Sequence, residues 1–422
     1  MSYKYLQKEA YKQKQNANDF DIDKEYQSRL NGPSTFSTPL FPVLTDKTKL
    51  QEDDRPIFFV ETTSIIQKSN EIIKNSSRIK SLESVLPGVA KQSYTNSLLV
   101  DEIKYTNEIE GIETHRSELG TMVGEVQNES IKKSTSQKRL ISTVKLYNDI
   151  LTKPIRQIND YQDLRDIYDT LTNGEISSDK QPDGEYFRNG RVYIGGVSNE
   201  THVPPVNESK IKPKIKSLID FMNNDNYPEI EKAIVTHFMF ENIHPFYDGN
   251  GRTGRYLLSQ YLSNKIDVFS ALSLSKTIRD NEAKYYKIFQ EAEIYNNYGE
   301  LTFFIEEFMN IIIESQKNVI DKLNNLTEVL SDTISSILEK TKIDFQDNEK
   351  NIIFIFVQSK IFTSNKTLGI KDTELIDMLY KEDPTTYKKR GTKRFIQKLE
   401  EIGLLTSISS NPLQHEISDQ YL

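Results

Sequence analysis

The sequence contains no cysteine among its 422 residues. Disulfide bonds and thiolate metal sites are therefore excluded, and the absence fits a reducing compartment such as the cytoplasm. No stretch reaches the roughly 18 consecutive apolar residues that a membrane-spanning helix needs. Residues 1–10 are polar and lack the apolar stretch of a secretory signal. We therefore expect a cytoplasmic protein that has no membrane contact.

Positive charge is also in short supply, because 54 lysines and arginines face 62 acidic residues and leave a formal net charge of −8. This balance argues against nonspecific coating of nucleic acid by the whole chain. The hydrophobic share is a modest 36%, but a chain of this length can still bury a sizeable core. The length itself predicts two or three domains.

One stretch carries more chemistry than any other in the chain. It reads His244-Pro245-Phe246-Tyr247-Asp248-Gly249-Asn250-Gly251-Arg252-Thr253-Gly254-Arg255. Apolar residues at helical spacing predict a helix over 229–242, and Pro245 is poorly suited to continue it. A second helical pattern begins near Gly251. The intervening loop therefore precedes a helix N-terminus, where free backbone N–H groups and the helix dipole favour an anion.

The side chains of this loop suit a nucleotide triphosphate. Glycines let the backbone approach a phosphate closely, and Arg252 and Arg255, three residues apart, can fork onto phosphate oxygens. Asp248 is a hard oxygen ligand suited to Mg²⁺. His244 could accept a proton from an attacking hydroxyl, at a rate expected to fall near its unperturbed pKa of roughly 6.5. The alternative is a polar loop that merely ends in a basic helix start.

At these residues the chain resembles the Fic family, whose signature is H-P-F-x-[D/E]-G-N-G-R-x-x-R, and every defined position matches. Most members move AMP from ATP onto a Ser, Thr or Tyr hydroxyl of a protein, with release of pyrophosphate. The resemblance implies that His244 is the base and that Asp248 holds Mg²⁺ between phosphates. It implies that Arg252 contacts the β-phosphate and Arg255 the γ-phosphate. The implied nucleotide contacts in the loop are Gly249, Asn250, Gly251, Arg252, Thr253, Gly254 and Arg255.

A second match to the family lies upstream, in Thr106-Asn107-Glu108-Ile109-Glu110-Gly111, which fits the inhibitory pattern [S/T]-x-x-x-E-[G/N]. Thr106 and Glu110 are i and i+4 on a predicted helix that ends at Gly111. The resemblance implies that Glu110 pairs with Arg255 and occupies the γ-phosphate position. In some relatives the equivalent glutamate also assists removal of AMP. The alternative is a solvated glutamate at a helix end.

Two further segments resemble parts of the family that surround the nucleotide. Val192 to Ile194 is a short β-prone run between turn signals, so it predicts a hairpin, similar to the flap that pairs with a target's backbone. The implied flap residues are Ile194, Gly195, Gly196 and Val197. We expect His202 to be structural. A helix over 275–292 carries Tyr285 and Tyr286, which similar proteins place against adenosine, although either could simply pack a helix face.

The C-terminal region has a different pattern. Three predicted helices, two short strands at 404–410 and 414–417, and an intervening Gly403 resemble a winged helix. The third helix carries six basic residues that could contact a DNA backbone, namely Lys388, Lys389, Arg390, Lys393, Arg394 and Lys398. The alternative is a winged helix used for dimerisation or target docking. Homodimers are common among similar proteins.

We therefore predict an all-α protein with a Fic helical core, a small β-hairpin flap and a C-terminal winged helix. The predicted regions are an irregular arm at 1–55, a helical region with the inhibitory motif at 56–135, a catalytic domain at 136–342 and a winged-helix-like domain at 343–422. A long helix is expected over 300–342, with a break near Asn324-Asn325.

The predicted function is that of an autoinhibited protein adenylyltransferase, with ATP as substrate and Mg²⁺ as cofactor, acting on another protein or on itself. The alternative is a DNA-binding regulator that uses the same loop to sense nucleotide. A third interpretation, a zinc site formed by His237, Glu241 and His244 at i, i+4 and i+7, lacks the usual H-E-x-x-H order.

Overall fold

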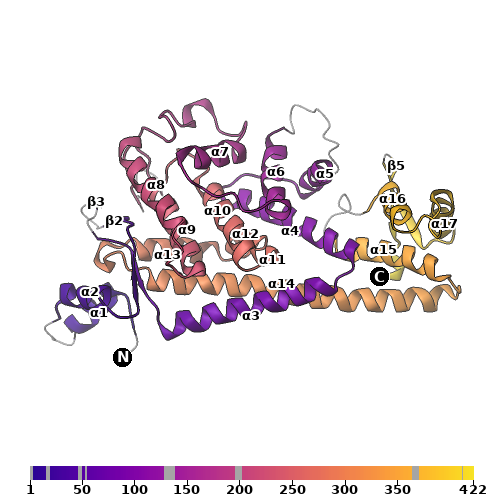
Figure 1. The fold of residues 1–422 in the computed structure, drawn as a ribbon, viewed down its shortest axis with the longest axis horizontal. Helices are drawn as coiled ribbons and strands as arrows, with labels where there is room; N and C mark the ends of the chain where they lie inside the picture. The colour runs from indigo at the N-terminus through magenta and orange to yellow at the C-terminus, as the bar shows by residue number, and fades with distance from the viewer. Residues whose placement is uncertain are drawn as a thin grey trace. The chain divides into compact units, whose positions relative to one another are not determined.

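The computed structural model describes residues 3–15, 20–45, 50–52, 55–127, 138–194, 202–363, 370–410 and 412–422. Its long elements are helices, and each of its three sheets has only two strands (Figure 1). The predicted all-α class is therefore confirmed. No helix in these ranges combines the length and the apolar character needed to cross a bilayer.

The chain divides into two compact units. The first comprises Met1–Ser76, Tyr105–Glu113 and Lys133–Gln316, and the second comprises Ser77–Lys104, Thr114–Lys132 and Lys317–Leu422. Three of the five divisions fall inside helices, which are α3 (Thr63–Val85), α4 (Gly88–Ile109) and α14 (Thr302–Thr341). The last five residues of α4, from Tyr105 to Ile109, and Glu110 itself thus belong to the first unit.

The core of the first unit is built around helices α9 and α10, most of whose residues are buried. The helices of this unit, apart from those that cross its boundary, are α1 (Leu6–Gln15), α2 (Ile22–Leu30), α6 (Lys138–Thr152), α7 (Tyr161–Leu171), α8 (Glu208–Met222), α9 (Glu229–Ile243), α10 (Asn250–Lys265), α11 (Val268–Ala271), α12 (Leu274–Asp280) and α13 (Glu282–Ala292). Helix α9 packs against α8 and α10, and α10 also packs against α6, α7 and α11 (Figure 1). Because α9 and α10 are covered on most sides, they hold the loop between them rigidly.

Local sequence explains the ends of α9. Pro228 precedes its first residue, where a missing N–H costs nothing, and two acidic residues in the first turn suit the helix dipole. At the other end His244 takes a left-handed conformation, with φ at 48°, and Pro245 follows. The next helix starts at Asn250 directly after Gly249, whose φ is +80°.

The segment predicted to be an irregular arm contains two helices and three short strands, and a fourth short strand follows it. The strands are β1 (Thr35–Ser37), β2 (Val43–Thr45), β3 (Leu50–Glu52) and β4 (Phe58–Val60), and they pair as β1–β4 and β2–β3, both antiparallel. Leu6 and Tyr26 of this segment form a buried cluster with Phe58 and Tyr298. The prediction was wrong because these contacts stabilise helices whose own periodicity is weak.

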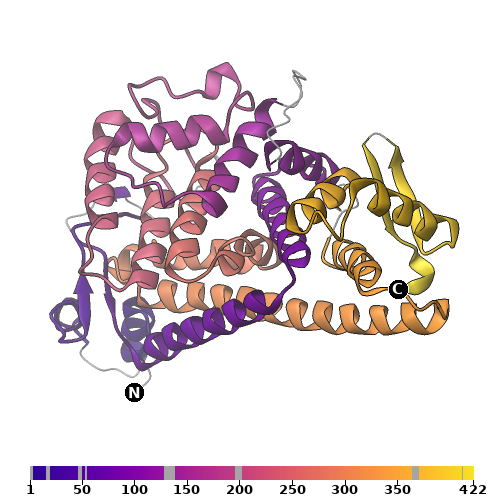
Figure 2. The ribbon, with the colours of Figure 1, turned by 45° about the vertical axis from the view of Figure 1, so that its right-hand side comes forward.

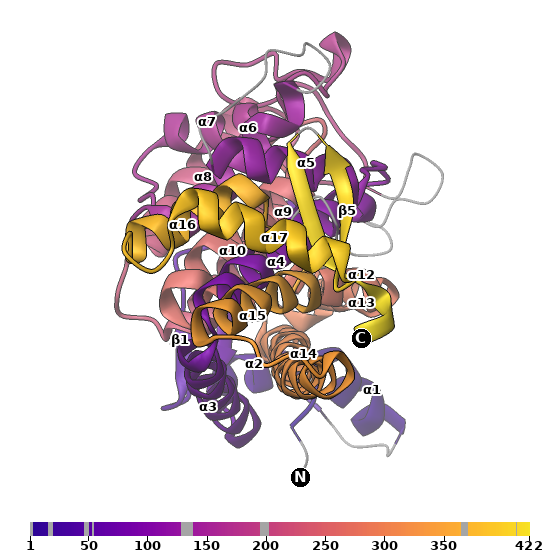
Figure 3. The ribbon, with the colours of Figure 1, turned by 90° about the vertical axis from the view of Figure 1, so that its right-hand side faces the viewer.

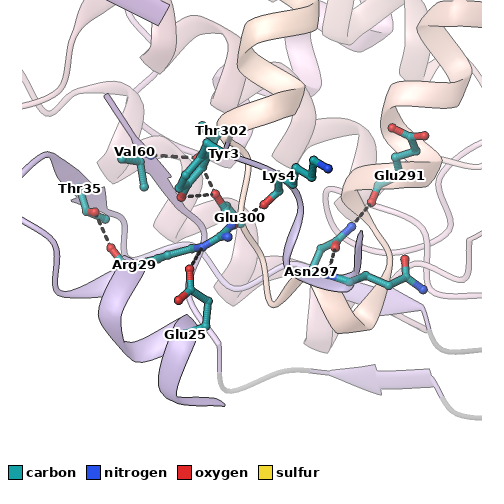
Figure 4. A network of polar contacts seen from close by, with 11 residues as sticks. Tyr3, Lys4, Glu25, Arg29, Thr35, Val60, Glu291, Asn297, Glu300 and Thr302 are labelled. Carbon is teal, nitrogen blue, oxygen red and sulfur yellow. Dashed lines mark hydrogen bonds and ion pairs between the residues drawn. The ribbon is translucent and has the colours of Figure 1, made fainter. Parts of the chain in front are cut away.

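A buried ion pair binds the same N-terminal segment to Glu300, as Figure 4 shows. Arg29 Nη1 donates to Glu300 Oε2 at 2.9 Å, and Arg29 Nε donates to Glu25 Oε1 at 2.8 Å. Tyr3 and Thr302 donate hydroxyl hydrogen bonds to Glu300 Oε1, at 2.6 and 2.9 Å. Because the carboxylate of Glu300 is fully buried, these donors compensate for its lost hydration.

The second unit ends in three helices and a hairpin, in the predicted order. These elements are α15 (Asp347–Ile361), α16 (Asp372–Glu382), α17 (Lys389–Glu401), β5 (Leu405–Ser410) and β6 (Leu413–Ile417). Helix α17 packs against α16 and β5, and α15 packs against β6 (Figures 2 and 3). The unit also contains α5 (Arg116–Gln127).

Two helix boundaries differ from the predictions. Helix α14 runs without a break through Asn324 and Asn325, because both are exposed while Leu323 and Leu326 on either side are buried. The helix predicted over 275–292 is divided into α12 and α13 at Asn281, whose side chain donates to Thr277 O at 3.0 Å.

Candidate active site

The loop between α9 and α10 is held in place by its own side chains. In the side-chain amide of Asn250, Oδ1 accepts a hydrogen bond from Phe246 N and Nδ2 donates one to Phe246 O, both at 2.9 Å. Phe246 is fully buried and stacks on Tyr168 of α7, with ring centroids 3.7 Å apart. Asn250 thus uses its side chain to shape the loop, and Thr253 Oγ1 likewise donates to Gly249 O at 2.9 Å.

A buried arginine that the sequence analysis missed fixes the position of His244. Arg188 Nε donates to His244 O at 2.8 Å, and Arg188 N donates to Pro245 O at 3.0 Å. Arg188 Nη1 donates to Gly190 O at 2.7 Å. Burial lowers the pKa of Arg188 to about 10, so it stays charged near neutral pH. Only its burial distinguishes it from Arg191, which lies in the same polar stretch and is exposed.

His244 is poised to act as a neutral base. Its pKa is lowered to about 3, chiefly by burial and further by the positive charge of Arg188 and by His202. The Nδ1 atom of His244 has no hydrogen-bond partner in the described part of the chain. His244 as a whole is partly exposed, and a neutral imidazole can take a proton from a hydroxyl at physiological pH.

The two residues of the upstream motif meet Arg255. Arg255 Nε donates to Thr106 Oγ1 at 2.8 Å, and Arg255 Nη2 donates to Thr106 O at 3.0 Å and to Glu110 Oε1 at 2.7 Å. Burial alone would lower the pKa of Arg255, but the facing carboxylate of Glu110 outweighs it and the pKa is raised. A Cβ atom at Gly251 would overlap Glu110 Oε1, so this glycine makes room for the carboxylate.

Arg252 has a different environment. It is buried, and its Nη1 atom donates to a carboxylate oxygen of Glu175, which follows α7. Its Nε and Nη2 atoms have no hydrogen-bond partner among the described residues. The contact with Glu175 was not foreseen in the sequence.

Asp248 is suited to a cation. Its Oδ1 atom accepts a hydrogen bond from Gly249 N at 2.7 Å, while Oδ2 lies 3.4 Å from Lys180 Nζ and the side chain is partly exposed. A lysine ammonium therefore already faces the oxygen that would bind a metal. Mg²⁺ commonly takes one or two carboxylates and completes its shell with phosphates and water, and a single accessible carboxylate fits that pattern.

The alternative zinc cluster does not form. His237 is a buried core residue whose Nε2 atom lies 2.9 Å from Tyr285 Oη, and burial followed by the charge of Arg255 lowers its pKa to about 3. Glu241 lies against α10, where a Cβ at Gly254 would overlap its Oε1 atom. Across the described ranges, no group of three or more metal-ligating side chains is found.

Only part of the predicted flap falls within the described residues. Ile194 N donates to His202 O at 3.1 Å, and the two residues form an antiparallel bridge. Gly195, Gly196 and Val197 lie outside the described residues. His202 is buried, and its Nε2 atom lies 2.8 Å from Asn242 O, which fits the structural role expected for it.

The tyrosine pair of α13 is split between the core and the surface. Tyr285 is buried and bonded to His237, whereas Tyr286 is 43% exposed. The two rings meet edge to face at 5.4 Å. Tyr286 is thus the member of the pair that a nucleotide base could reach. Glu293, close to the end of α13, is buried and accepts a hydrogen bond from Asn242 Nδ2 at 3.0 Å.

Comparison with known proteins points to the same segment. Residues 158–262 match the family model described as "Fic/DOC family". The protein adenylyltransferase Fic of Aedes aegypti is 28% identical over 188 residues, which are 44% of this chain and 34% of that protein. The protein adenylyltransferase fic-1 of Caenorhabditis elegans is 33% identical over 76 residues, which are 17% of this chain and 14% of that protein. The chain therefore carries a Fic domain, and it spans at most about a third of these two relatives.

Solved structures give weaker likenesses. The alignment with a Fic family protein from Desulfovibrio desulfuricans covers 85% of this chain and 97% of that protein's chain. The identity is 16% and the TM-score is 0.48. The alignment with the Fic-1 fragment of Caenorhabditis elegans covers 63% of this chain and 74% of the fragment. The identity is 16% and the TM-score is 0.43.

Proposed function

We propose that this protein is an adenylyltransferase that moves AMP from ATP to a hydroxyl group of a protein, and that its own helix α4 inhibits it. One observation carries the proposal. A neutral His244, whose backbone is held by Arg188, directly precedes the loop that leads into α10, and the first turns of α10 contain the buried Arg252 and Arg255. The relatives named protein adenylyltransferase support the same chemistry.

The chain's own residues suit each part of an in-line transfer. His244 takes the proton of the target hydroxyl as its oxygen bonds to the α-phosphorus of ATP. The bond from that phosphorus to the bridging oxygen breaks, and pyrophosphate leaves. Arg252, Arg255 and the first N–H groups of α10 stabilise the charge that develops on the leaving group. Mg²⁺, when held by Asp248, would neutralise phosphate charge.

The contacts of Arg255 support the proposal that the protein inhibits itself. Thr106 and Glu110 accept hydrogen bonds from its Nε and Nη2 atoms, so a γ-phosphate cannot use the same donors while the pair is intact. Glu110 is 23% exposed and lies just beyond the last residue of α4, where it can be displaced without unpacking a core. We propose that withdrawal of Glu110 lets the triphosphate bind productively.

Incubation with Mg²⁺ and ATP, followed by intact-mass measurement, tests both parts of the proposal. We expect a one-AMP adduct on Glu110→Gly, little on the natural sequence and none on Glu110→Gly/His244→Ala. Glu108→Gly, a substitution on the same helix turn, is the matched control and should behave as the natural sequence does. Because a target protein could be required, a fluorescent ATP analogue and a cell lysate extend the assay. Labelling that survives the loss of His244 would contradict the proposal.

A second function, DNA binding by the C-terminal elements, is supported by the surface of α17. We propose that α15, α16, α17 and the β5–β6 hairpin form a winged helix. One face of α17 is buried through Thr392, Phe395, Ile396 and Leu399. Four exposed basic side chains on and just before α17 make no ion pair within the described ranges, and they are Lys388, Arg390, Lys393 and Arg394. Such a face can contact phosphates of a duplex.

Fluorescence anisotropy with a labelled duplex tests this second function. Arg390→Ala/Arg394→Ala should weaken binding and reduce the slope of log K against log salt concentration by about two, one for each lost phosphate contact. Lys350→Ala/Lys381→Ala, two exposed lysines outside α17, is the matched control. Equal loss in both variants would show that the chain's charge, and not this face, governs binding.

A further inference from the structure

Arg252 is held by the described residues through one of its three side-chain nitrogens. Its residue surface is only 2% exposed, and Nη1 donates to a carboxylate oxygen of Glu175. In the part of the chain that the structure describes, Nε and Nη2 have no acceptor. Buried donors almost always find a partner in folded proteins, and leaving them unpaired is costly. The unsatisfied edge of Arg252 therefore indicates a place where a ligand supplies the acceptors.

Glu175 reaches Arg252 because of the turn that follows α7. The backbone of Gly174 is left-handed, with φ at +72°, and Glu175 N donates to Thr172 O at 2.9 Å. This turn packs on the loop before α10, since a Cβ at Gly249 would lie 2.8 Å from Thr172 Cγ2. The side chain of Glu175 is only 6% exposed, although Asn173 and Gly174 beside it are exposed. The carboxylate is thus directed inward by a specific backbone conformation.

The orientation of the guanidinium follows from this contact. A guanidinium is planar and presents its donors as forks, and each fork matches two oxygens of a phosphate. With Nη1 bound to Glu175, the buried Nε–Nη2 fork is the one that no described residue of the chain satisfies. We propose that Glu175 is a positioning residue. It holds Arg252 so that the Nε–Nη2 fork of the guanidinium faces a phosphate of ATP. This inference rests on the proposed nucleotide site.

Comparison with Arg255 argues against Glu175 as a second inhibitor. On Arg255 the Nε and Nη2 atoms are the ones taken, by Thr106 and Glu110. On Arg252 no described residue accepts a hydrogen bond from the same two atoms. Glu110 is also partly exposed, whereas Glu175 is enclosed. One carboxylate therefore covers the fork of its arginine, and the other leaves the fork uncovered and fixes its direction.

Calorimetric binding of ATP and of adenosine, without any transfer step, tests the proposal. We would compare Glu175→Ala and Glu175→Gln, both in the Glu110→Gly background so that Arg255 is available. Glu175→Ala should weaken ATP binding roughly tenfold, the size of one lost charge-assisted contact, and leave adenosine binding unchanged. Glu175→Gln keeps an oxygen acceptor and should recover part of the loss. Asp169→Asn, which removes a surface partner of Arg165 on α7, is the matched control.

Three results would overturn the proposal. Tighter ATP binding by Glu175→Ala would mean that Glu175 competes with phosphate. Equal losses for ATP and adenosine would mean that the residue only maintains the fold. An undiminished effect of Glu175→Ala in an Arg252→Ala background would mean that it does not act through Arg252. Because binding is measured directly, absence of AMP transfer would refute the proposed function and leave this inference standing.

Discussion

The carboxylate of Glu110 lies 2.7 Å from Nη2 of Arg255, across 145 residues of sequence. Thr106, one helical turn before Glu110, accepts two further hydrogen bonds from the same guanidinium. The end of α4 and the start of α10 are thus joined by a charged pair at the place proposed for the γ-phosphate.

Glu110 and Arg255 should be energetically coupled. Glu110→Gly should raise AMP incorporation by at least tenfold, because it frees Arg255. Arg255→Ala should abolish that gain, because the donor to the γ-phosphate is lost with the pair. The double variant should therefore match Arg255→Ala alone in initial rates of AMP incorporation. Independent, additive effects of the two substitutions would show that the contact does not control activity.

The pH profile should not follow an ordinary histidine. The sequence alone predicts a fall in rate near pH 6.5, but burial, Arg188 and His202 lower the pKa of His244 to about 3. A base whose pKa is lowered stays unprotonated as the pH falls, so the transfer rate should be level from pH 8 to 5. Initial rates for Glu110→Gly across this range, in buffers of constant ionic strength, provide the measurement. An inflection near pH 6.5 that moves in Arg188→Met would mean that His244 is hydrated more than this structure indicates.

Removal of Lys180 should lower the Mg²⁺ concentration that the protein needs for activity. The ammonium group of Lys180 lies 3.4 Å from Asp248 Oδ2 and competes with a metal for that oxygen. Since the pair is largely exposed, the effect should be small, and Lys180→Met should lower the half-maximal Mg²⁺ concentration by about two- to fivefold. Lys216→Met, which removes another exposed lysine paired with an aspartate, should leave it unchanged. Equal Mg²⁺ responses in all three proteins would exclude the competition.

Loss of Arg29 should destabilise the first unit strongly. Glu300 is fully buried against Arg29, and its remaining partners are hydroxyl groups (Figure 4). Arg29→Met would leave a buried carboxylate without its cation, a change that costs about 3–5 kcal/mol. Arg29→Met/Glu300→Gln should recover part of the loss. Urea unfolding followed by tyrosine fluorescence measures these differences, and Lys24→Met, in an exposed pair with Asp21, is the control. A loss below about 1 kcal/mol for Arg29→Met would show that the pair contributes little.

Much of the candidate site could be predicted from the sequence because its parts are local. His244, Asp248, Arg252 and Arg255 lie within twelve consecutive residues, so a proline, a glycine and a helix start are enough to place them. The ends of α9 and α10 follow the same local rules. The C-terminal helices and hairpin were likewise predicted in order, since each has its own apolar periodicity and turn residues.

Contacts across long stretches of chain had no such signal. Arg188 binds the backbone of His244 across 56 residues, and Glu175 binds Arg252 across 77. Neither residue lies in a pattern that distinguishes it from a surface charge. The break near Asn324 and the irregular arm were wrong for a related reason, because tertiary packing outweighs weak local preference.

The sequence by itself determined which chemical groups stand at the start of α10 and in what order. It did so because a loop between two helices obeys short-range steric and hydrogen-bonding rules. Only the tertiary structure decided their state: the pKa of His244, the covering of Arg255 and the open fork of Arg252. These depend on burial and on charges brought in from α4 and from the turn after α7, and such long-range terms exist only once the chain has packed.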